Sequence, residues 1–283
     1  MKGIVWLASY PKSGNTWFRI FLANLLADRP EPVDINTIRI ENFAARTTYD
    51  RALGWETGEL TIEEAFQARL EVQKEQAEEE DVFFKVHEAF RDPVTRVPLF
   101  SRAATRAALY FLRNPLDVAV SYSHHRGKDI DNTIARMNRT DAVMASAKYE
   151  LGAQLPQPTG TWSWHVRSWL DEPEFPIMLL RYEDMLDRPQ VVFQAACEFA
   201  GLPSEPARVA RALAHSSFDT LRQQEQAKGF REAQEQRPFF RQGKAGGWRE
   251  ILSPEQVATI ISHHGDVMRR FGYLNTDGSL PGN

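Results

Sequence analysis

The segment Tyr10–Trp17 carries residue types that bind phosphate or sulfate. An apolar, β-branched run, Ile4–Ala8, has the length of a strand and enters this segment directly, and apolar residues at helical spacing follow it. A strand, a short turn and a helix start bring backbone N–H groups and the positive end of a helix dipole to one point. Gly14 permits close backbone approach, and Lys12 adds positive charge. The segment therefore predicts an anion site, with an ordinary strand-to-helix turn as the alternative.

The order of lysine and glycine in this segment differs from that of nucleotide triphosphatases. Their loop, G-x-x-x-x-G-K-[ST], places the lysine after the second glycine and a hydroxyl on the magnesium ion. In this chain Lys12 precedes Gly14, and the first glycine of the pattern is absent. The sequence therefore disfavours a magnesium–ATP site of that type.

Further basic residues and a histidine lie at the ends of other predicted strands. Lys85 and His87 are two positions apart, so they project from the same face of a strand. Arg113 follows another apolar run and precedes a predicted helix that contains Ser121; a guanidinium there can hold a phosphate through two hydrogen bonds. Functional side chains gather beyond the carboxyl ends of strands in open α/β sheets. A structural histidine and an ion-paired arginine are the alternatives.

A late basic cluster runs from Phe239 to Arg249. It places Arg241, Lys244 and Arg249 among three glycines, which lets the backbone wrap closely around an anion. A flexible, solvated loop is the alternative.

Alternating strands and helices must position these residues. Capping signals at Thr61, Asn114 and Ser253 indicate helix starts. Residues 126–160 lack a clean period, which is typical of a substrate-covering segment or of an irregular surface loop. The pattern predicts an α/β fold with a doubly wound, mainly parallel sheet flanked by helices. Its buried strands are predicted at Ile4–Ser9, Val82–His87, Ala107–Leu112 and Ile177–Tyr182.

The composition predicts a soluble, cytoplasmic protein. A chain of 283 residues can form one large α/β domain, expected over residues 1–283. The net charge of −4 argues against general nucleic-acid binding. Cys197 is the single cysteine, the N-terminal residues are not expected to form a signal peptide, and no apolar run is long enough to span a bilayer. The paired histidines at 124–125 and 263–264 lack ligands at metal-binding spacing. We therefore expect no nucleic-acid, membrane or metal partner.

In order and type, these segments resemble the cytosolic-type sulfotransferases over nearly the whole chain. That family uses 3′-phosphoadenosine 5′-phosphosulfate (PAPS) and releases 3′-phosphoadenosine 5′-phosphate (PAP). Tyr10–Trp17 resembles its 5′-phosphosulfate loop, Phe84–His87 its K-x-H strand end, and Tyr110–Tyr122 its 3′-phosphate motif. Four later segments match in the same order: Gly160–Trp169, Leu180–Met185, Ser216–Phe218 and Arg241–Trp248.

The resemblance implies in-line transfer of a sulfonate from PAPS to a hydroxyl of a small-molecule acceptor, a phenol or an alcohol. It implies that His87 is the general base, that Lys12 neutralises the leaving phosphate with Lys85 assisting at the sulfonate, and that Ser121 binds the 3′-phosphate and steers Lys12. Lysine charge replaces magnesium, so no metal is required. The implied cofactor-binding residues are Lys12, Ser13, Gly14, Asn15, Thr16, Trp17, Arg113, Ser121, Tyr182, Ser216, Phe218, Arg241, Gln242 and Gly243.

Two positions depart from the family pattern. Gln242 stands where the family often has lysine, and Gly247 stands where it often has aspartate. The first change removes a positive charge from the 3′-phosphate site, for which Lys244 is a candidate replacement.

The acceptor and the assembly remain open. Aromatic residues are candidates for lining an apolar acceptor pocket, with core packing as the alternative: Trp55, Phe90, Trp162 and Trp164. A monomer and a homodimer are both compatible with the sequence. The alternative functions are a nucleotide or small-molecule kinase of related fold and a non-catalytic PAP- or PAPS-binding protein. Lys12 together with His87 argues against the non-catalytic alternative.

Overall fold

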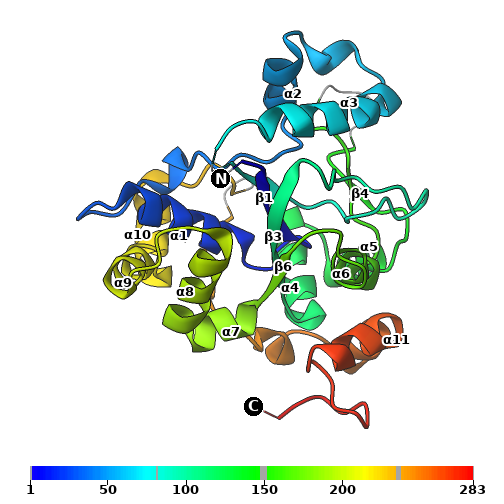
Figure 1. The fold of residues 1–283 in the computed structure, drawn as a ribbon. Coiled ribbons are helices and arrows are strands. Elements are labelled where there is room, and N and C mark those ends of the chain that lie inside the picture. Colours follow the sequence, from blue (N-terminus) through cyan, green and yellow to red (C-terminus); the bar gives the residue numbers. More distant parts are fainter. Residues whose placement is uncertain (1, 81, 147–151, 234–236, 283) are drawn as a thin grey trace.

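A four-stranded sheet with the order β2-β1-β3-β6 forms the centre of the molecule (Figure 1). The structure is a computed structural model and describes residues 2–80, 82–146, 152–233 and 237–282. Every neighbouring pair of strands is parallel, which confirms the predicted class of fold. The strands are β1 (Ile4–Ser9), β2 (Phe83–Val86), β3 (Thr105–Leu112) and β6 (Ile177–Arg181). They differ from the predicted segments only at their ends.

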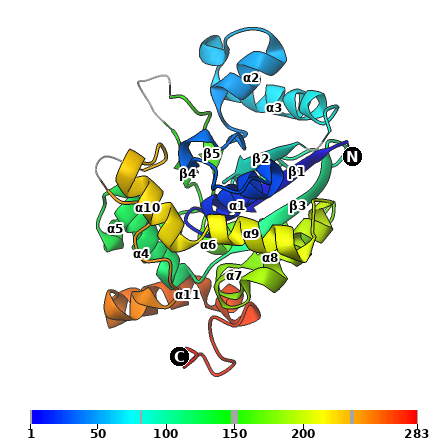
Figure 2. The same ribbon diagram turned by 90° about the vertical axis from the view of Figure 1, so that its left-hand side faces the viewer.

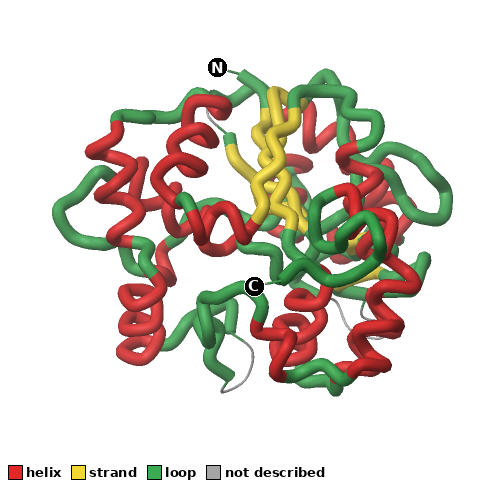
Figure 3. The backbone as a smooth tube through the Cα atoms, turned by 90° about the horizontal axis from the view of Figure 1, so that it is seen from below, coloured by secondary structure: helices red, strands yellow, loops and turns green. Residues whose placement is uncertain are grey.

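Helices cover both faces of the sheet, which explains why its strands are almost continuously apolar. Val5 and Leu7 of β1 point into one core, and Ile4, Trp6 and Ala8 point into the other. Figure 3 shows the sheet between the two helical layers. The first face is covered by α1 (Asn15–Ala27), α8 (Pro189–Ala200), α9 (Pro206–His215) and α10 (Phe218–Lys228). The second is covered by α2 (Arg46–Leu53), α3 (Ile62–Gln76), α4 (Pro115–Arg126), α6 (Trp162–Leu170) and α11 (Pro254–Arg270).

The strand order places a topological switch between β1 and β3. After β1 the chain passes to β2 on one side, and it then returns to β3 on the other side. Ligands bind in the crevice outside the carboxyl ends of such strands. The loop 10–14, His87 and Arg113 follow β1, β2 and β3 directly, so they all fall at this edge. In Figure 2 the N-terminus marks the opposite end of β1, and α10 lies toward the carboxyl edge.

The predicted caps begin the helices that they were expected to begin. Thr61 forms a capping box with Glu64, whose carboxylate accepts a hydrogen bond from Thr61 N at 2.9 Å. The side chain of Asn114 accepts from Leu116 N at 3.0 Å at the start of α4, and Ser253 caps α11. The remaining short helices are η1 (Ile35–Thr37), η2 (Thr57–Glu59), α7 (Tyr182–Asp187) and η3 (Gly247–Glu250).

Residues 126–160 contain more regular structure than the sequence pattern predicted. Helix α5 (Ile130–Met137) begins after Asp129, whose carboxylate accepts from a backbone N–H of the first turn at 2.6 Å. Strand β4 (Val143–Met144) pairs antiparallel with β5 (Gln157–Pro158). The interpretation of residues 126–160 as lacking a helical period was therefore wrong for α5. The N-capping aspartate is a local signal for the start of this helix. The centre of the segment, 147–151, lies outside the described residues.

No helix within the described part of the chain is long and apolar enough to cross a membrane.

Candidate functional site

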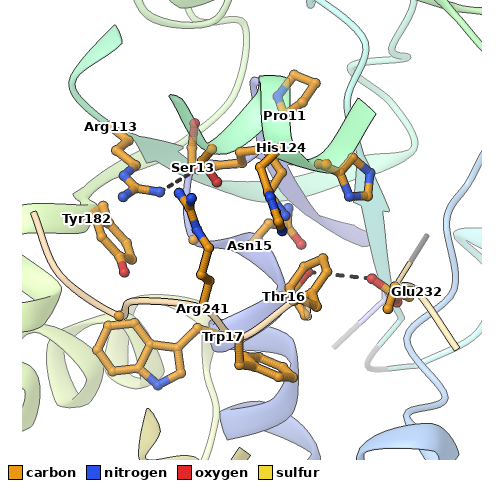
Figure 4. A pocket seen from close by; sticks show the side chains of 18 of the residues that line it. Pro11, Ser13, Asn15, Thr16, Trp17, Arg113, His124, Tyr182, Glu232 and Arg241 are labelled. Atoms are coloured by element: carbon orange, nitrogen blue, oxygen red, sulfur yellow. Dashed lines mark hydrogen bonds between the residues drawn. The ribbon is translucent and has the colours of Figure 1, made fainter. Parts of the chain in front are cut away.

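A cavity of about 520 Å³ opens at the carboxyl edge of the sheet (Figure 4). In Figure 4, Arg113 and Tyr182 lie on one side of the cavity, and Glu232 lies on the other side beside Thr16. The cavity wall contains every residue that the sequence predicted for catalysis or cofactor binding: Lys12, Ser13, Gly14, Asn15, Thr16, Trp17, Lys85, His87, Arg113, Ser121, Tyr182, Ser216, Phe218, Arg241, Gln242 and Gly243.

The loop between β1 and α1 has a backbone that only a few residue types adopt readily. Gly14 has φ 103°, and a Cβ added to it would lie 2.8 Å from Cδ2 of Tyr182. Lys12 also has a positive φ, 68°. The Asn15 amide donates to Leu7 O at 2.8 Å, which ties the first residue of α1 back to the strand. The loop therefore holds a fixed shape at the N-terminus of a helix, where anions bind.

Two buried donors at this edge of the sheet, one in this loop and one directly after β3, lack protein partners among the described residues. Ser13 Oγ and Arg113 Nε are buried, and neither makes a hydrogen bond with the residues that the structure describes. Both are donors, and an unpartnered buried donor is costly. A phosphate or sulfonate oxygen supplies the acceptor that each of them needs. The donor set therefore fits an anionic ligand.

His87 is held in the orientation of a base. Its Nδ1 lies 2.8 Å from Ser9 O, and because a carbonyl only accepts, Nδ1 carries the proton. The other nitrogen, Nε2, makes no hydrogen bond among the described residues and keeps its lone pair. Burial, followed by the charge of Lys85, holds the pKa of His87 well below its ordinary value. The imidazole is therefore neutral at neutral pH and able to accept a proton.

Lys12 and Arg113 form the cationic side of the cavity. Lys12 Nζ lies 3.7 Å from the centroid of the Phe239 ring. Burial, followed by the charge of Arg113, lowers the pKa of Lys12 to about 7. Arg113 donates to Lys12 O at 3.1 Å and to Lys244 O at 3.2 Å, and its guanidinium stacks 4.3 Å from the Tyr182 ring centroid. These contacts join the first loop to the late basic cluster.

Sequence reasoning missed Glu232, which lies in the cavity wall after α10. Its carboxylate accepts from Arg19 at 2.8 and 3.2 Å and lies 3.8 Å from Lys85 Nζ. Burial opposes its ionisation, but the charges of Lys85 and Arg19 lower the pKa of Glu232 to about 2. Burial in turn lowers the pKa of Lys85 to about 8, against the opposing charge of Glu232. Glu232 thus favours the charged form of Lys85.

Asp117 is a second residue that sequence reasoning missed. Its two carboxylate oxygens accept from Gly246 N at 2.8 Å and from Trp248 N at 3.2 Å. It therefore fixes the late glycine-rich loop to the start of α4, beside Arg113. An aspartate in the first turn of a helix is ordinarily explained by the helix dipole, so the sequence gives no signal of this contact.

Ser216 is engaged within the protein, although it lies at the cavity. Its hydroxyl donates to Ala212 O at 2.9 Å, and its carbonyl accepts from Trp17 Nε1 at 3.0 Å. Ser216 therefore orients Trp17, whose ring also packs 5.0 Å from that of Phe193. By contrast, Ser121 Oγ makes no hydrogen bond in the described part of the chain, so its hydroxyl is available in the cavity wall.

Two sets of candidate residues lie outside the cavity wall. Lys244, the candidate replacement for the lysine missing at Gln242, is not part of the cavity wall, and its ammonium lies 3.6 Å from Glu250. The aromatic residues proposed for the acceptor pocket do not line the cavity either. Phe90 and Trp162 are packed in the core, and Trp55 is exposed. The guanidinium of Arg96 covers the ring of Trp164.

Among the described residues, no group of three or more His, Cys, Asp or Glu side chains could hold a metal ion.

Known proteins of one family match this chain in sequence. The family model described as the sulfotransferase domain matches residues 2–272. Sulfotransferase 2A6 from Rattus norvegicus is 30% identical over 164 residues, which are 56% of this chain and 55% of the rat protein. Cytosolic sulfotransferase 17 from Arabidopsis thaliana is 24% identical over 285 residues, covering 95% of this chain and 75% of the plant protein. The match thus spans about half the length of the first relative.

Solved structures share the fold. Retinol dehydratase in complex with androsterone and inactive cofactor PAP has a TM-score of 0.61 at 18% identity, covering 94% of this chain and 80% of that one. A mouse sulfotransferase complexed with PAP has a TM-score of 0.56 at 18% identity, covering 98% of this chain and 86% of that one. Because the family match runs from β1 past α11 and includes every described residue of the cavity wall, the chain belongs to the sulfotransferase family.

Proposed function

We propose that this protein transfers a sulfonate group from PAPS to a hydroxyl group of a small-molecule acceptor. The observation that carries the proposal is a neutral imidazole, His87, with Nδ1 fixed on Ser9 O, in one cavity with the cationic side chains of Lys12 and Arg113. The family membership, and the PAP in the two similar structures described above, support PAPS as the donor.

Each residue has a distinct part in this proposal. PAPS, when bound, supplies an activated sulfonate and a phosphate leaving group. His87 Nε2 accepts the proton of the acceptor hydroxyl as that oxygen attacks. Lys12 balances the charge that develops on the leaving phosphate oxygen, and Lys85, held by Glu232, stabilises the sulfonate oxygens. Ser13 and Arg113 satisfy their free donors on anionic oxygens.

The remaining cavity residues are assigned to the nucleotide. Arg113, Ser121 and Arg241 bind the 3′-phosphate, with Gln242 as a neutral donor in the same segment. Trp17 and Phe218 pack against the adenine, and Gly243 fits under Phe218, because a Cβ there would lie 2.4 Å from its ring. The other contacts proposed for the donor come from Gly14, Asn15, Thr16, Tyr182 and Ser216.

A binding and turnover experiment tests the proposal. PAP is expected to stabilise the protein by about 2.7 kcal/mol at a hundred-fold excess over its Kd, and labelled PAPS is expected to transfer its sulfonate to a hydroxyl acceptor. Stabilisation by ATP with magnesium and none by PAP would instead support a kinase. PAP binding without turnover on any acceptor would support a non-catalytic binding protein.

Arg113→Ala is expected to weaken the binding of PAP much more than the binding of AMP, which lacks the 3′-phosphate. Losing one partner of a charge-assisted hydrogen bond costs roughly 1.5–3 kcal/mol, or about ten- to a hundred-fold in Kd. Arg113 also holds Lys12 O and Lys244 O, so general loosening of the loops would weaken both nucleotides alike. Titration calorimetry with both ligands separates these cases, and equal losses would remove Arg113 from the 3′-phosphate site. Gln242→Lys should tighten PAP by less than the Arg113 loss.

PAP binding is expected to take up about one proton at about pH 8, since the pKa of Lys12 is about 7 in the free protein. Anionic phosphate favours the charged amine and raises this pKa, so PAP affinity falls as the pH rises above the free-protein value. Lys85, with a pKa of about 8, adds a smaller uptake. Calorimetry in buffers of different ionisation enthalpy measures the uptake. A value near zero would show that Lys12 is already charged in the free protein.

A further inference from the structure

One part of the cavity wall lies beside the proposed catalytic face and outside the proposed nucleotide site. The segment around Asn42 runs parallel to the edge of β2: Phe43 N donates to Lys85 O at 2.9 Å, and Lys85 N donates to Glu41 O at 2.9 Å. Asn42 is paired with Lys85, so the two side chains project from the same face. His87, two residues further along the chain, projects from that face as well. Asn42 therefore lies on the face of this sheet edge that also carries Lys85 and His87.

Asn42 belongs to a cluster of side-chain amides. Its Nδ2 donates to Gln154 Oε1 at 3.2 Å and to Gln157 Oε1 at 3.4 Å. Gln157 Nε2 also donates to Gln154 Oε1, at 2.8 Å. These bonds occupy Gln154 Oε1 twice, and none of the described residues accepts a hydrogen bond from Gln154 Nε2. Because Gln154 lines the cavity, it offers a fixed neutral donor there.

His125, at the end of α4, adds a second neutral polar group to the same cavity. Burial, followed by the charges of Lys12 and Lys85, lowers the pKa of His125 to about 4. Its ring stands edge-on to Phe239 at 6.1 Å, and neither of its nitrogens makes a hydrogen bond among the described residues. A neutral imidazole offers one donor and one acceptor. The wall of the cavity that contains His87 therefore presents both a hydrogen-bond donor and a hydrogen-bond acceptor.

Four charged groups here, Glu232, Arg19, Lys85 and Arg231, already have partners within the protein. Arg19 holds the Glu232 carboxylate at 2.8 Å, and Lys85 lies beside it. The Arg231 guanidinium donates to Ile38 O at 2.7 Å. A charged group on the acceptor would have to compete with these contacts. Neutral hydroxyl groups, which both donate and accept, match the unpartnered atoms of Gln154 and His125.

We propose that the acceptor is a neutral polyhydroxylated molecule, a glycoside or a polyol, that Gln154 and His125 bind through hydroxyl groups next to the one that receives the sulfonate. This inference rests on the proposed sulfotransferase function and departs from a simple phenol or apolar alcohol. An apolar acceptor of the same shape would cover the amide cluster and leave its donor without water or a partner. Sites built to hydrogen-bond a substrate reject analogues that lack the hydroxyl.

The test compares two acceptors of similar ring size, each with one primary alcohol: methyl glucoside and cyclohexylmethanol. With labelled PAPS and the full chain, kcat/KM for methyl glucoside is expected to exceed that for cyclohexylmethanol by at least about tenfold. Equal or higher kcat/KM for cyclohexylmethanol, or labelling of neither while PAP still binds, overturns the polyol inference and leaves a PAPS-binding site in place. Failure of PAP to bind overturns the proposed function itself.

Two variants test whether Gln154 and His125 cause the expected preference for methyl glucoside over cyclohexylmethanol. Gln154→Met keeps the length of the side chain and removes its amide, and His125→Phe keeps a ring and removes its nitrogens. Each is expected to lower the ratio of the two kcat/KM values about fivefold or more, while PAP affinity is retained. Gln67→Met, an exposed position on α3, is the matched control and should leave the ratio unchanged. An unchanged ratio in both cavity variants would contradict the inference.

Discussion

Replacing His87 with alanine or asparagine is expected to lower turnover by about 10²–10⁴, the usual contribution of a general base, while PAP binding is retained. The structure gives the reason, because Nδ1 donates to Ser9 O and Nε2 is the atom left to accept a proton. Because PAP is expected to contact the cationic side of the cavity, loss of the imidazole should lower kcat and leave the Kd of PAP nearly unchanged. Steady-state turnover with labelled PAPS, together with PAP calorimetry, measures both quantities.

Asparagine is the sharper of the two substitutions at His87. Its amide N–H can replace the bond to Ser9 O, so the strand end is preserved while the base is lost. A structural role would predict that His87→Asn restores activity relative to His87→Ala. The base assignment predicts that both variants are similarly inactive and that added imidazole rescues the alanine variant. Near wild-type turnover in His87→Asn would assign proton removal to another group or to water.

Local signals were sufficient to predict most of the fold. The four strands are almost continuously apolar because helices cover both faces, and that pattern is visible in the sequence without any partner. The caps at Thr61 and Asn114 are also local, since each satisfies N–H groups within three residues of itself. Helix α5 was missed because it is short and begins only three residues after Gly127, which ends α4, although Asp129 marks its start.

The cavity residues were predictable for a different reason. Parallel strands end at one edge, so residues that follow β1, β2 and β3 must meet there, however far apart they lie in the chain. Asp117, Glu232 and Asn42 could not be found in this way. Their positions depend on contacts with Gly246, Arg19 and Gln154, and no spacing in the sequence encodes those tertiary contacts.

The polar residues on the proposed acceptor side of the cavity could not be predicted from the sequence either. Trp162 and Phe90 have the size and apolarity of pocket-lining residues, but such residues are equally suited to a core, and both are buried there. Lys244 has the right charge in the right loop, yet its ammonium turns toward Glu250. Composition indicates what a segment can bind, whereas the direction of each side chain is decided by its neighbours.

Replacing Lys12 with alanine is expected to lower turnover by about 10²–10³ through lost stabilisation of the developing charge, and to weaken PAP as well. The second effect distinguishes it from the His87 variants, because in the proposed function Lys12 contacts the phosphate both before and after transfer. A positive φ is energetically unfavourable for both lysine and alanine, so the substitution adds little backbone strain at this position. Single-turnover rates and PAP calorimetry separate the chemical step from binding.

Lys12→Met is the matched variant for this prediction. Methionine keeps an apolar stem of similar length and replaces the ammonium that lies over the Phe239 ring with an uncharged thioether group, so the loop should keep its packing. If charge is what matters, Lys12→Met should be as slow as Lys12→Ala, and most of the proton uptake on PAP binding should disappear with it, since Lys12 is the group with the pKa of about 7. Turnover near that of the wild type in Lys12→Met would show that the side chain acts by packing, and Lys85 or Arg113 would then have to carry the charge stabilisation.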